Sequence, residues 1–394
     1  MAPLIRHTLR NLRWWIALGV AAVLVTLGIC TADAHTNVTS KYDYNRDVFP
    51  LLRDHCGRCH VTGGVAPMSL MTYEGTVPWG GSIRDELTSG RMPPWPIDPR
   101  SPGVKGMHPI SAHDVDVIVT WLTGGTPRDW SSDLNRQLPI VTLQKQWKLG
   151  PPDLVVSMES AYTLGANAVE ETKEFSIPSG ITEVKWVRAA DLLPEMPAIV
   201  RDAIISVENG PALALWQPGS DPLAAPSDAA FLVAPGAKLH LQIHYKKPYT
   251  QEQDALSDKS SIGLYFTDRP VSGRELQSMS ASEKEAGRES SGVQILRAAL
   301  PSAGRVYALR PMLDKAYDSV EIVAITPGGK RISLLLLRGP RPQWFRRYWL
   351  QEATELLRGS VIEARFSALA DDSDEMKASI GRFPLHVAVD YVPQ

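Results

Sequence analysis

The strongest chemical signal in the sequence is the run Cys56-Gly57-Arg58-Cys59-His60. Two thiols three positions apart on a helical turn can each add to a vinyl group of one haem. A histidine directly after the second thiol can then bind the iron as its proximal ligand. The third cysteine, Cys30, belongs to an N-terminal export segment, so Cys56 and Cys59 are the cysteines of the mature chain. We therefore predict one covalent haem c, attached through Cys56 and Cys59 and ligated by His60.

Two other kinds of site also use paired cysteines. A redox dithiol of the thioredoxin type needs a βαβ context, which the sequence does not show. A structural zinc site needs two more ligands nearby, of which His55 could supply one. Both sites stay as alternatives to covalent haem, and the export segment favours the haem.

A sixth iron ligand has to come from downstream of the haem motif. Met92 is the preferred candidate, because Pro93-Pro94 directly after it restrict the backbone and lower the cost of ordering the ligand. Thioether ligation would raise the potential relative to ligation by two histidines. The rival candidates are Met68 and Met71, which we expect to pack against the porphyrin as apolar side chains, and Met107, His108 and His113.

Further runs around the motif are similar to a known family. They are Asp47–Leu52, Ala66–Met68, Met71–Glu74, Arg91–Trp95 and Trp121–Pro127. The segment resembles a class I cytochrome c, and more narrowly the cytochrome module of bacterial proteins that carry a copper type II, ascorbate-dependent monooxygenase-like region. The resemblance implies that two jelly-roll sandwiches follow, each with one copper, as in the peptidylglycine and dopamine monooxygenases. It is strong over about residues 42–130 and weaker beyond them.

The sequence lacks most of the first set of copper ligands that the resemblance implies. That copper is held in the family by a His-His pair on one strand and a third histidine on a later strand. Arg201-Asp202 stands where the pair is expected, whereas His244 matches the third histidine. A guanidinium cannot coordinate copper, so Arg201 places a permanent cation where a metal would lie.

The second copper is affected in the same way. It needs a His-x-His and a distant methionine, and only Met376 matches, because Leu309–Leu313 contains no histidine. Two copper centres need at least five imidazoles, whereas residues 150–394 contain three histidines. We therefore expect copper to be absent, and one residual copper at His240, His244 and Met376 is the alternative.

The N-terminus predicts export from the cytoplasm. Residues 1–34 have a basic start, an apolar run over residues 14–30, and small residues where a signal peptidase would cut. The apolar run also reaches the lower length limit for crossing a bilayer, so an uncleaved membrane anchor is the alternative. In both cases the mature chain is periplasmic.

The chain has 394 residues, with 41 basic and 43 acidic side chains, and this near balance gives no electrostatic reason to expect nucleic acid as a partner. A helix capped by Ser111 and ended by Gly124-Gly125 closes the N-terminal part. Alternating apolar residues then predict many short strands, with a hairpin at Pro327-Gly328-Gly329 and an exposed polar linker over 268–292. The strands are expected over Leu154–Met158, Glu183–Ala190, Ile199–Val207, Lys238–Tyr245, Ile262–Thr267, Val306–Leu309, Ser319–Ile325, Arg331–Leu337, Val361–Ser367 and Leu385–Val392.

One cluster combines arginines with aromatic residues over residues 338–349. It is either a solvated edge with core aromatics or a docking surface, since both residue types are enriched at interfaces.

We expect a multidomain fold: a small all-α cytochrome c domain over 42–130, followed by two all-β jelly-roll sandwiches over 150–270 and 292–394. The predicted function is electron transfer by a periplasmic mono-haem cytochrome whose β region is a scaffold or docking subunit without a catalytic residue of its own. Its partner would be a redox protein or a larger periplasmic or membrane complex. The alternative function is an active copper-dependent monooxygenase that receives electrons from the haem.

Overall fold

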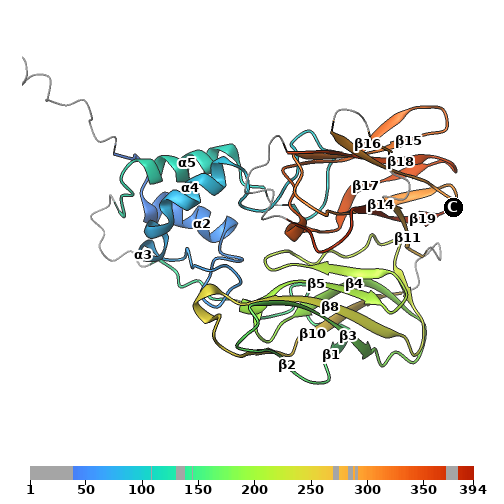
Figure 1. Cartoon of the computed structure of the whole chain (residues 1–394), viewed down its shortest axis with the longest axis horizontal. Coiled ribbons are helices and arrows are strands. Elements are labelled where there is room, and N and C mark those ends of the chain that lie inside the picture. Colours follow the sequence, from blue (N-terminus) through green and yellow to red (C-terminus); the bar gives the residue numbers. More distant parts are fainter. Residues whose placement is uncertain are drawn as a thin grey trace, which may run out of the picture.

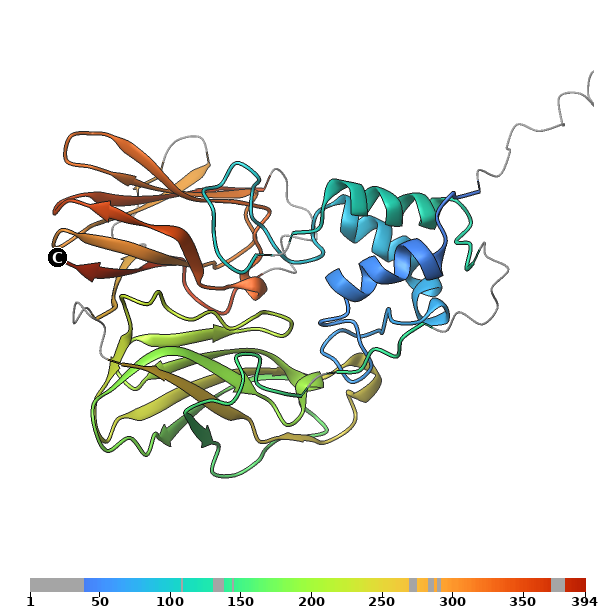
Figure 2. The same cartoon turned by 180° about the vertical axis from the view of Figure 1, so that it is seen from behind.

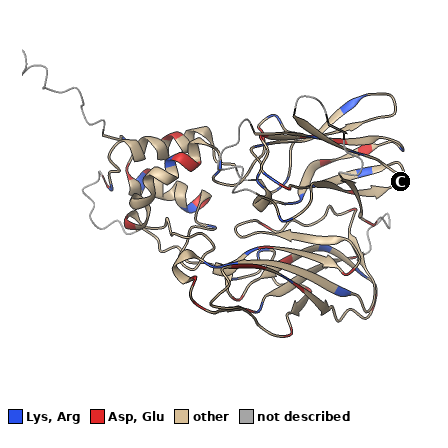
Figure 3. Ribbon diagram, in the orientation of Figure 1, with Lys and Arg blue, Asp and Glu red and all other residues tan. Residues whose placement is uncertain are grey.

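The computed structural model describes residues 39–107, 109–129, 138–143, 145–268, 275–282, 287–288, 292–369 and 380–394. The chain is mostly β, with 39% strand and 15% helix. A helical segment lies beside the ends of two stacked pairs of β-sheets, and both views show this arrangement (Figures 1 and 2). Basic and acidic residues are interspersed along the described chain, in line with their nearly equal numbers (Figure 3).

The helices of the N-terminal segment are short and separated by long loops. Its core contains Tyr44, Phe49, Leu52, Ile118 and Trp121, all at most 1% exposed. Helix α5 begins after Ser111, whose hydroxyl accepts the N–H of Asp114 as predicted, and ends at Gly124. The elements are η1 (Tyr44–Val48, a π turn), α2 (Phe49–His55), α3 (Tyr73–Thr76), η2 (Val77–Trp79), α4 (Gly80–Thr88) and α5 (Ala112–Thr123).

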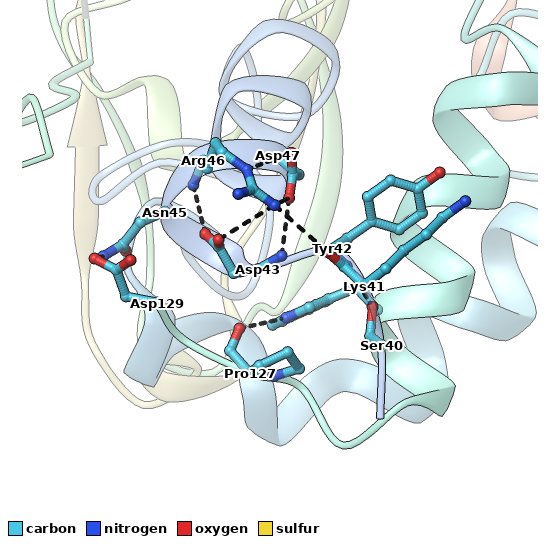
Figure 4. Close-up of polar contacts among 10 residues, drawn as sticks. Ser40, Lys41, Tyr42, Asp43, Asn45, Arg46, Asp47, Pro127 and Asp129 are labelled. Atoms are coloured by element: carbon cyan, nitrogen blue, oxygen red, sulfur yellow. Dashed lines mark hydrogen bonds and ion pairs between the residues drawn. The ribbon is translucent and has the colours of Figure 1, made fainter. Parts of the chain in front are cut away.

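Polar contacts tie the beginning of this segment to its end (Figure 4). The Asp43 carboxylate caps η1 by accepting the N–H of Arg46 at 2.8 Å, and the Arg46 guanidinium lies 2.9 Å from Asp47. The Asn45 side chain donates to Asp129 at 3.0 Å across 84 residues of sequence. The first and last residues of this segment therefore lie side by side.

The first sandwich consists of two antiparallel four-stranded sheets that face each other across a common core. Ile262 and Leu264 of one sheet pack in the same cluster as Leu239 and Leu241 of the other, as expected for strands with one buried face. One sheet has the order β1 (Leu154–Ser157), β10 (Ser261–Thr267), β4 (Lys185–Leu193) and β7 (Phe231–Val233). The other has the order β3 (Glu170–Pro178), β8 (Lys238–Lys246), β5 (Val200–Val207) and β6 (Ala212–Trp216), and a small pair joins β2 (Tyr162–Leu164) to β9 (Leu256–Asp258).

The second sandwich has the same two-layer construction. One sheet has the order β11 (Gln277–Ser282), β19 (His386–Pro393), β14 (Gly304–Met312) and β17 (Tyr348–Leu356). The other has the order β12 (Gly287–Arg288), β13 (Val293–Ala299), β18 (Val361–Ser367), β15 (Ser319–Ile325) and β16 (Arg331–Arg338). Single 3₁₀ turns precede or connect strands at η3 (Pro197–Ile199), η4 (Tyr249–Gln251) and η6 (Pro342–Trp344).

The ten predicted strands are confirmed, with ends that differ by at most three residues. The hairpin at Pro327-Gly328-Gly329 is also confirmed, because β15 and β16 pair antiparallel across it and Gly329 has a φ of 79°. The linker predicted over 268–292 is wrong where it includes β11, since this strand pairs with β19 along its whole length. Its Ser-rich sequence forms a sheet-edge strand because β19 offers a free edge there.

The predicted fold class is wrong, because the described residues include no small all-α domain ahead of the sandwiches. The four α-helices of the N-terminal segment have only 4 to 12 residues each, and the loop between α4 and α5 is part of the β structure. Ile97 forms a β-bridge with Leu337 of β16, and Val104 forms one with Leu350 of β17. Ile97, Val104 and Met107 also pack on the core of the second sandwich. The helical segment is therefore continuous with the β region, and the predicted domain limits stay predictions.

The two sandwiches are joined by a buried arginine. Arg347, 8% exposed, donates from Nη1 to the Leu213 carbonyl of the first sandwich at 2.7 Å. Its Nε donates to Asp390 of the second sandwich at 2.8 Å, and Asp390 is fully buried. Breaking such a buried charge pair is costly, so this contact stabilises the relative position of the two sandwiches.

The predicted export signal or anchor over residues 1–34 lies outside the described residues. Within the described ranges, no helix has the length and apolar character needed to cross a membrane.

Candidate functional site

A cavity of about 640 Å³ lies where the helical segment meets both sandwiches. Its volume is within the range of pockets that hold cofactors and other small molecules, roughly 300–1,000 Å³. The haem-motif side chains Cys56, Cys59 and His60 line it, together with Met92. Four sequence-predicted site residues therefore share one cavity with side chains from both sandwiches.

The haem motif forms a tight turn directly after α2. The N–H of His60 donates to the Cys56 carbonyl at 2.9 Å, and the N–H of Cys59 donates to the same oxygen at 3.1 Å. A Cβ on Gly57 would lie 2.5 Å from the Arg53 carbonyl oxygen and 3.0 Å from Met71 Sδ, so a larger residue would force the turn open. The turn brings both thiols and the imidazole to the same cavity.

Both thiols are free, and burial makes them poor nucleophiles. Burial raises the pKa of Cys56 to about 12, with a further increase from Cys59. Burial also raises the pKa of Cys59 to about 11, against the lowering effect of nearby cations that include Lys148. Reactive dithiols have lowered pKa values, so this environment is unlike that of a thioredoxin-type centre.

His60 is oriented with one ring nitrogen towards the cavity. Its Nδ1 donates to the Met68 carbonyl at 3.3 Å; since a carbonyl only accepts, this contact places the proton on Nδ1 and leaves the Nε2 lone pair free. Burial lowers the pKa of His60, so the imidazole is neutral near pH 7. A neutral imidazole fixed through Nδ1 is the form that ligates a metal.

Met92 is positioned by the end of α4. Its N–H donates to the Glu86 carbonyl at 3.2 Å, and the Glu86 side chain forms a two-point ion pair with Arg91. The segment that carries the thioether lines the cavity, as does the turn that carries His60. The structure therefore brings the predicted proximal and distal ligands to the same space.

The other ligand candidates are distributed differently. Met68 lines the cavity, whereas Met71 is 7% exposed in the core of the helical segment. Met107 packs on the second sandwich, and His113 is exposed in the first turn of α5. His108 lies outside the described residues.

The first sandwich contacts the haem motif through the loop after β6. Cys59 Sγ donates to the Pro218 carbonyl at 3.6 Å, and Arg58 pairs with Asp221 at 2.7 Å. Gly219 has a φ of +74°, and a Cβ there would lie 2.7 Å from Cys59 Sγ. Sequence reasoning missed this loop, although Pro218-Gly219 is a turn signal, because nothing in the sequence shows which turn meets the cysteines.

Two of the residues expected at the first copper position, Asp202 and His244, belong to an ion-pair network that lines the cavity. Asp202 and His244 are neighbours on β5 and β8, and His244 Nδ1 lies 3.0 Å from Asp202 Oδ2. His244 Nε2 lies 2.8 Å from Glu170 Oε1, and Arg382 donates to Asp202 at 2.6 Å. Both ring nitrogens of His244 therefore face carboxylates rather than open space.

His240 and His244 do not share a ligand position. His240 pairs with Ser176, four positions along the β3–β8 ladder from the Thr172–His244 pair, and its Nε2 lies 3.5 Å from Glu174. Met376 lies outside the described residues. In the part of the chain that the structure covers, no three His, Cys, Asp or Glu side chains are grouped to hold a metal ion.

The residues of the arginine and aromatic cluster are mostly buried. Arg346 and Arg347 are 6% and 8% exposed, which excludes the solvated edge for these two side chains. Arg346 instead contacts the segment after Met92: its Nη2 donates to the Pro94 carbonyl at 2.9 Å, and its guanidinium lies 4.3 Å from the ring centre of Trp95. The cluster therefore docks against another part of the same chain.

A comparison with models of protein families gave no match, and neither did a comparison with curated proteins. Among solved structures, the chain is similar to the major capsid protein P2 from bacteriophage PM2, with 11% identity, 61% of this chain and 96% of that chain covered, and a TM-score of 0.28. For allantoicase from Saccharomyces cerevisiae the identity is 6%, the coverage 56% and 77%, and the TM-score 0.19. Likeness at this level supports no conclusion about fold or function.

Proposed function

We propose that this chain is a c-type haem protein that transfers single electrons. One haem is attached through Cys56 and Cys59, with His60 as the proximal and Met92 as the distal iron ligand. The observation that carries the proposal is that all four side chains line one cavity, with the His60 Nε2 lone pair left free by the contact of Nδ1 with Met68.

The donor set fits the group. Thioether bonds would consume the two thiols, which explains why half-buried cysteines of raised pKa line the cavity wall. Imidazole and thioether are the ligand pair that gives a haem a high potential. Bound there, a haem would supply a one-electron redox centre, and the apolar and charged side chains of the cavity wall would tune its potential.

The β region has a scaffolding role in this proposal. Its contacts from Pro218 and Asp221 to the haem motif fix one side of the cavity, and Arg346 fixes the segment that carries Met92. The remaining surface of the sandwiches is available for a redox partner or a larger complex. We place the protein in the periplasm, as a soluble chain or one tethered by residues 14–30, because covalent haem attachment occurs outside the cytoplasm.

No contact among the described residues favours the alternative copper-dependent monooxygenase. His244 is held between two carboxylates, and Arg201 and Arg382 add cations where a metal cation would lie. Function therefore rests on the haem site alone.

The experiment is a joint measurement of iron and copper on exported, purified full-length protein, followed by reduction with a small-molecule donor. We expect one iron per chain, copper near zero and a reversible haem spectrum. Two coppers per chain would support the monooxygenase, and a chain without iron would end the electron-transfer proposal.

A further inference from the structure

Two arginines, one from each sandwich, extend into the cavity that holds the haem motif. Arg346 follows η6 of the second sandwich and is more than nine-tenths buried. Its Nη2 is occupied by the Pro94 carbonyl, whereas its Nε is buried without a hydrogen-bond partner. A buried guanidinium N–H without a partner is costly, so the groups of the described chain satisfy this side chain incompletely.

Arg201 has the same property on the other side. It extends from β5 and donates through Nη1 to the carbonyl of Val65, in the loop between His60 and Met68. Its Nε is also buried without a hydrogen-bond partner. Arg201 therefore contacts the loop of the proximal ligand, as Arg346 contacts the segment of the distal ligand.

The acidic groups nearest to Arg201 are already engaged. Asp202 is paired with Arg382 and His244, and Glu170 is paired with Lys246 at 2.8 Å and with His244. Burial lowers the pKa of both Arg201 and Arg346, because each guanidinium is largely removed from water.

The charge of the cavity wall indicates the charge of a group that would bind to the two guanidinium groups. Six Lys and Arg side chains and four Asp and Glu side chains line it. Arg58 is paired with Asp221 and Glu86 with Arg91, and both of these partners lie outside the wall, so the other described side chains of the wall keep an excess of two positive charges. A low-dielectric cavity with excess positive charge is stabilised by an anionic group that accepts hydrogen bonds from the guanidinium N–H groups.

We propose that Arg201 and Arg346 bind the two propionate carboxylates of the haem, so that the β region completes the cofactor site. This inference rests on the proposed function, because it assumes a haem attached at Cys56 and Cys59. It also gives a physical reason for an arginine at the position where the resemblance expects a copper ligand: a cation that repels a metal ion attracts a carboxylate.

The test uses haem-loaded full-length protein and the variants Arg201→Gln, Arg346→Gln and Arg346→Lys. The matched control is Arg305→Gln, because Arg305 Nε is also buried without a hydrogen-bond partner, but this side chain forms ion pairs with Asp228 and Glu355 and is not part of the cavity wall. The readouts are haem per chain and the midpoint potential as a function of pH.

Haem per chain should be unchanged in every variant, since the thioether bonds do not involve the arginines. In the two glutamine variants a buried propionate loses its cation, so its pKa rises and it titrates within the measured range. Ionisation of that group stabilises the oxidised iron, so the variants should match the wild type at acid pH and fall below its potential as the pH rises. Arg346→Lys keeps the charge and should restore most of the wild-type curve.

The proposal is overturned if haem-loaded Arg201→Gln and Arg346→Gln give the same potential curve as the wild type and Arg305→Gln. If Arg346→Gln does not fold, Arg201→Gln decides, because Arg201 comes from a different sandwich and is less buried. Absence of covalent haem in the wild type would instead refute the proposed function, so the two failures are distinguishable.

Discussion

Replacement of Gly219 by alanine tests the contact between the first sandwich and the haem motif. Gly219 has a φ of +74°, which costs a non-glycine residue about 1–2 kcal/mol. The added Cβ would also lie 2.7 Å from Cys59 Sγ and 3.2 Å from Arg58 Cβ. Overpacking of this kind costs a further amount of about 1–3 kcal/mol, because Cys59 is fixed by its turn and cannot move away freely. We expect Gly219→Ala to lower the free energy of unfolding by about 2–5 kcal/mol in total.

Gly180 provides a matched control in the same sandwich. Its φ is also +74°, and a Cβ there would meet no atom within 4 Å, so Gly180→Ala reports the backbone cost alone. The assay is urea unfolding followed by tryptophan fluorescence, on haem-free and haem-loaded protein. The difference between the two variants should be larger in the haem-loaded protein, because a thioether bond holds Cys59 Sγ more firmly. Equal destabilisation by the two substitutions in both forms would refute the contact.

Three further predictions follow from other parts of the structure. Met92→Ala should remove the spectral signature of thioether ligation from the oxidised haem and lower its potential, whereas Met107→Ala, on the second sandwich, should change neither; the reverse result would assign the ligand to Met107. In protein without haem, alkylation of Cys56 and Cys59 at pH 8 should be at least about 100-fold slower than in urea. The reason is that their pKa values of about 12 and about 11 lie two units or more above 9.0, the ordinary pKa of a cysteine thiol. Equal rates would show that the fold does not protect the thiols. Burial raises the pKa of Glu363, but hydrogen bonds from three arginines outweigh it and lower the pKa to about 2, so its contribution to stability is complete above pH 4.5 and is lost as the pH falls towards 2. That contribution is at most about 3 kcal/mol, and Glu363→Gln should flatten the acid side of a plot of stability against pH; an unchanged slope would contradict it.

The sequence alone predicts the strands and the last helix well, because both depend on local patterns. Alternation in Lys238–Tyr245 and a hydroxyl cap at Ser111 act within a few residues of the chain. The strand β11 was missed because its polar sequence has no apolar alternation, and its pairing with β19 is a long-range contact.

The predicted fold class is wrong for a related reason, because it too depends on contacts between residues far apart in the sequence. Short apolar stretches between Pro and Gly residues predict helices but not whether those helices form a separate unit. The bridges from Ile97 to β16 and from Val104 to β17 depend on the shape of a sandwich more than 200 residues away in the sequence. A pattern read along the N-terminal segment carries no information about that surface.

Some residues of the candidate site can also be predicted from the sequence, whereas others can be identified only from the folded chain. Cys56, Cys59 and His60 follow from spacing, because attachment of a haem requires that spacing. Arg201 and Arg346 do not, since the sequence marks Arg201 only as a lost copper ligand and Arg346 only as part of an aromatic cluster. Only the folded chain shows that both extend into the same cavity as the cysteines.

The most direct test of the account is the intact mass of the exported full-length chain, produced in cells that attach haem c. We predict the polypeptide mass plus one haem, which stays bound under denaturing conditions, and the bare polypeptide mass for the variant with both Cys56→Ala and Cys59→Ala. A wild-type chain at the bare polypeptide mass, with both thiols open to alkylation in urea, would contradict the central claim.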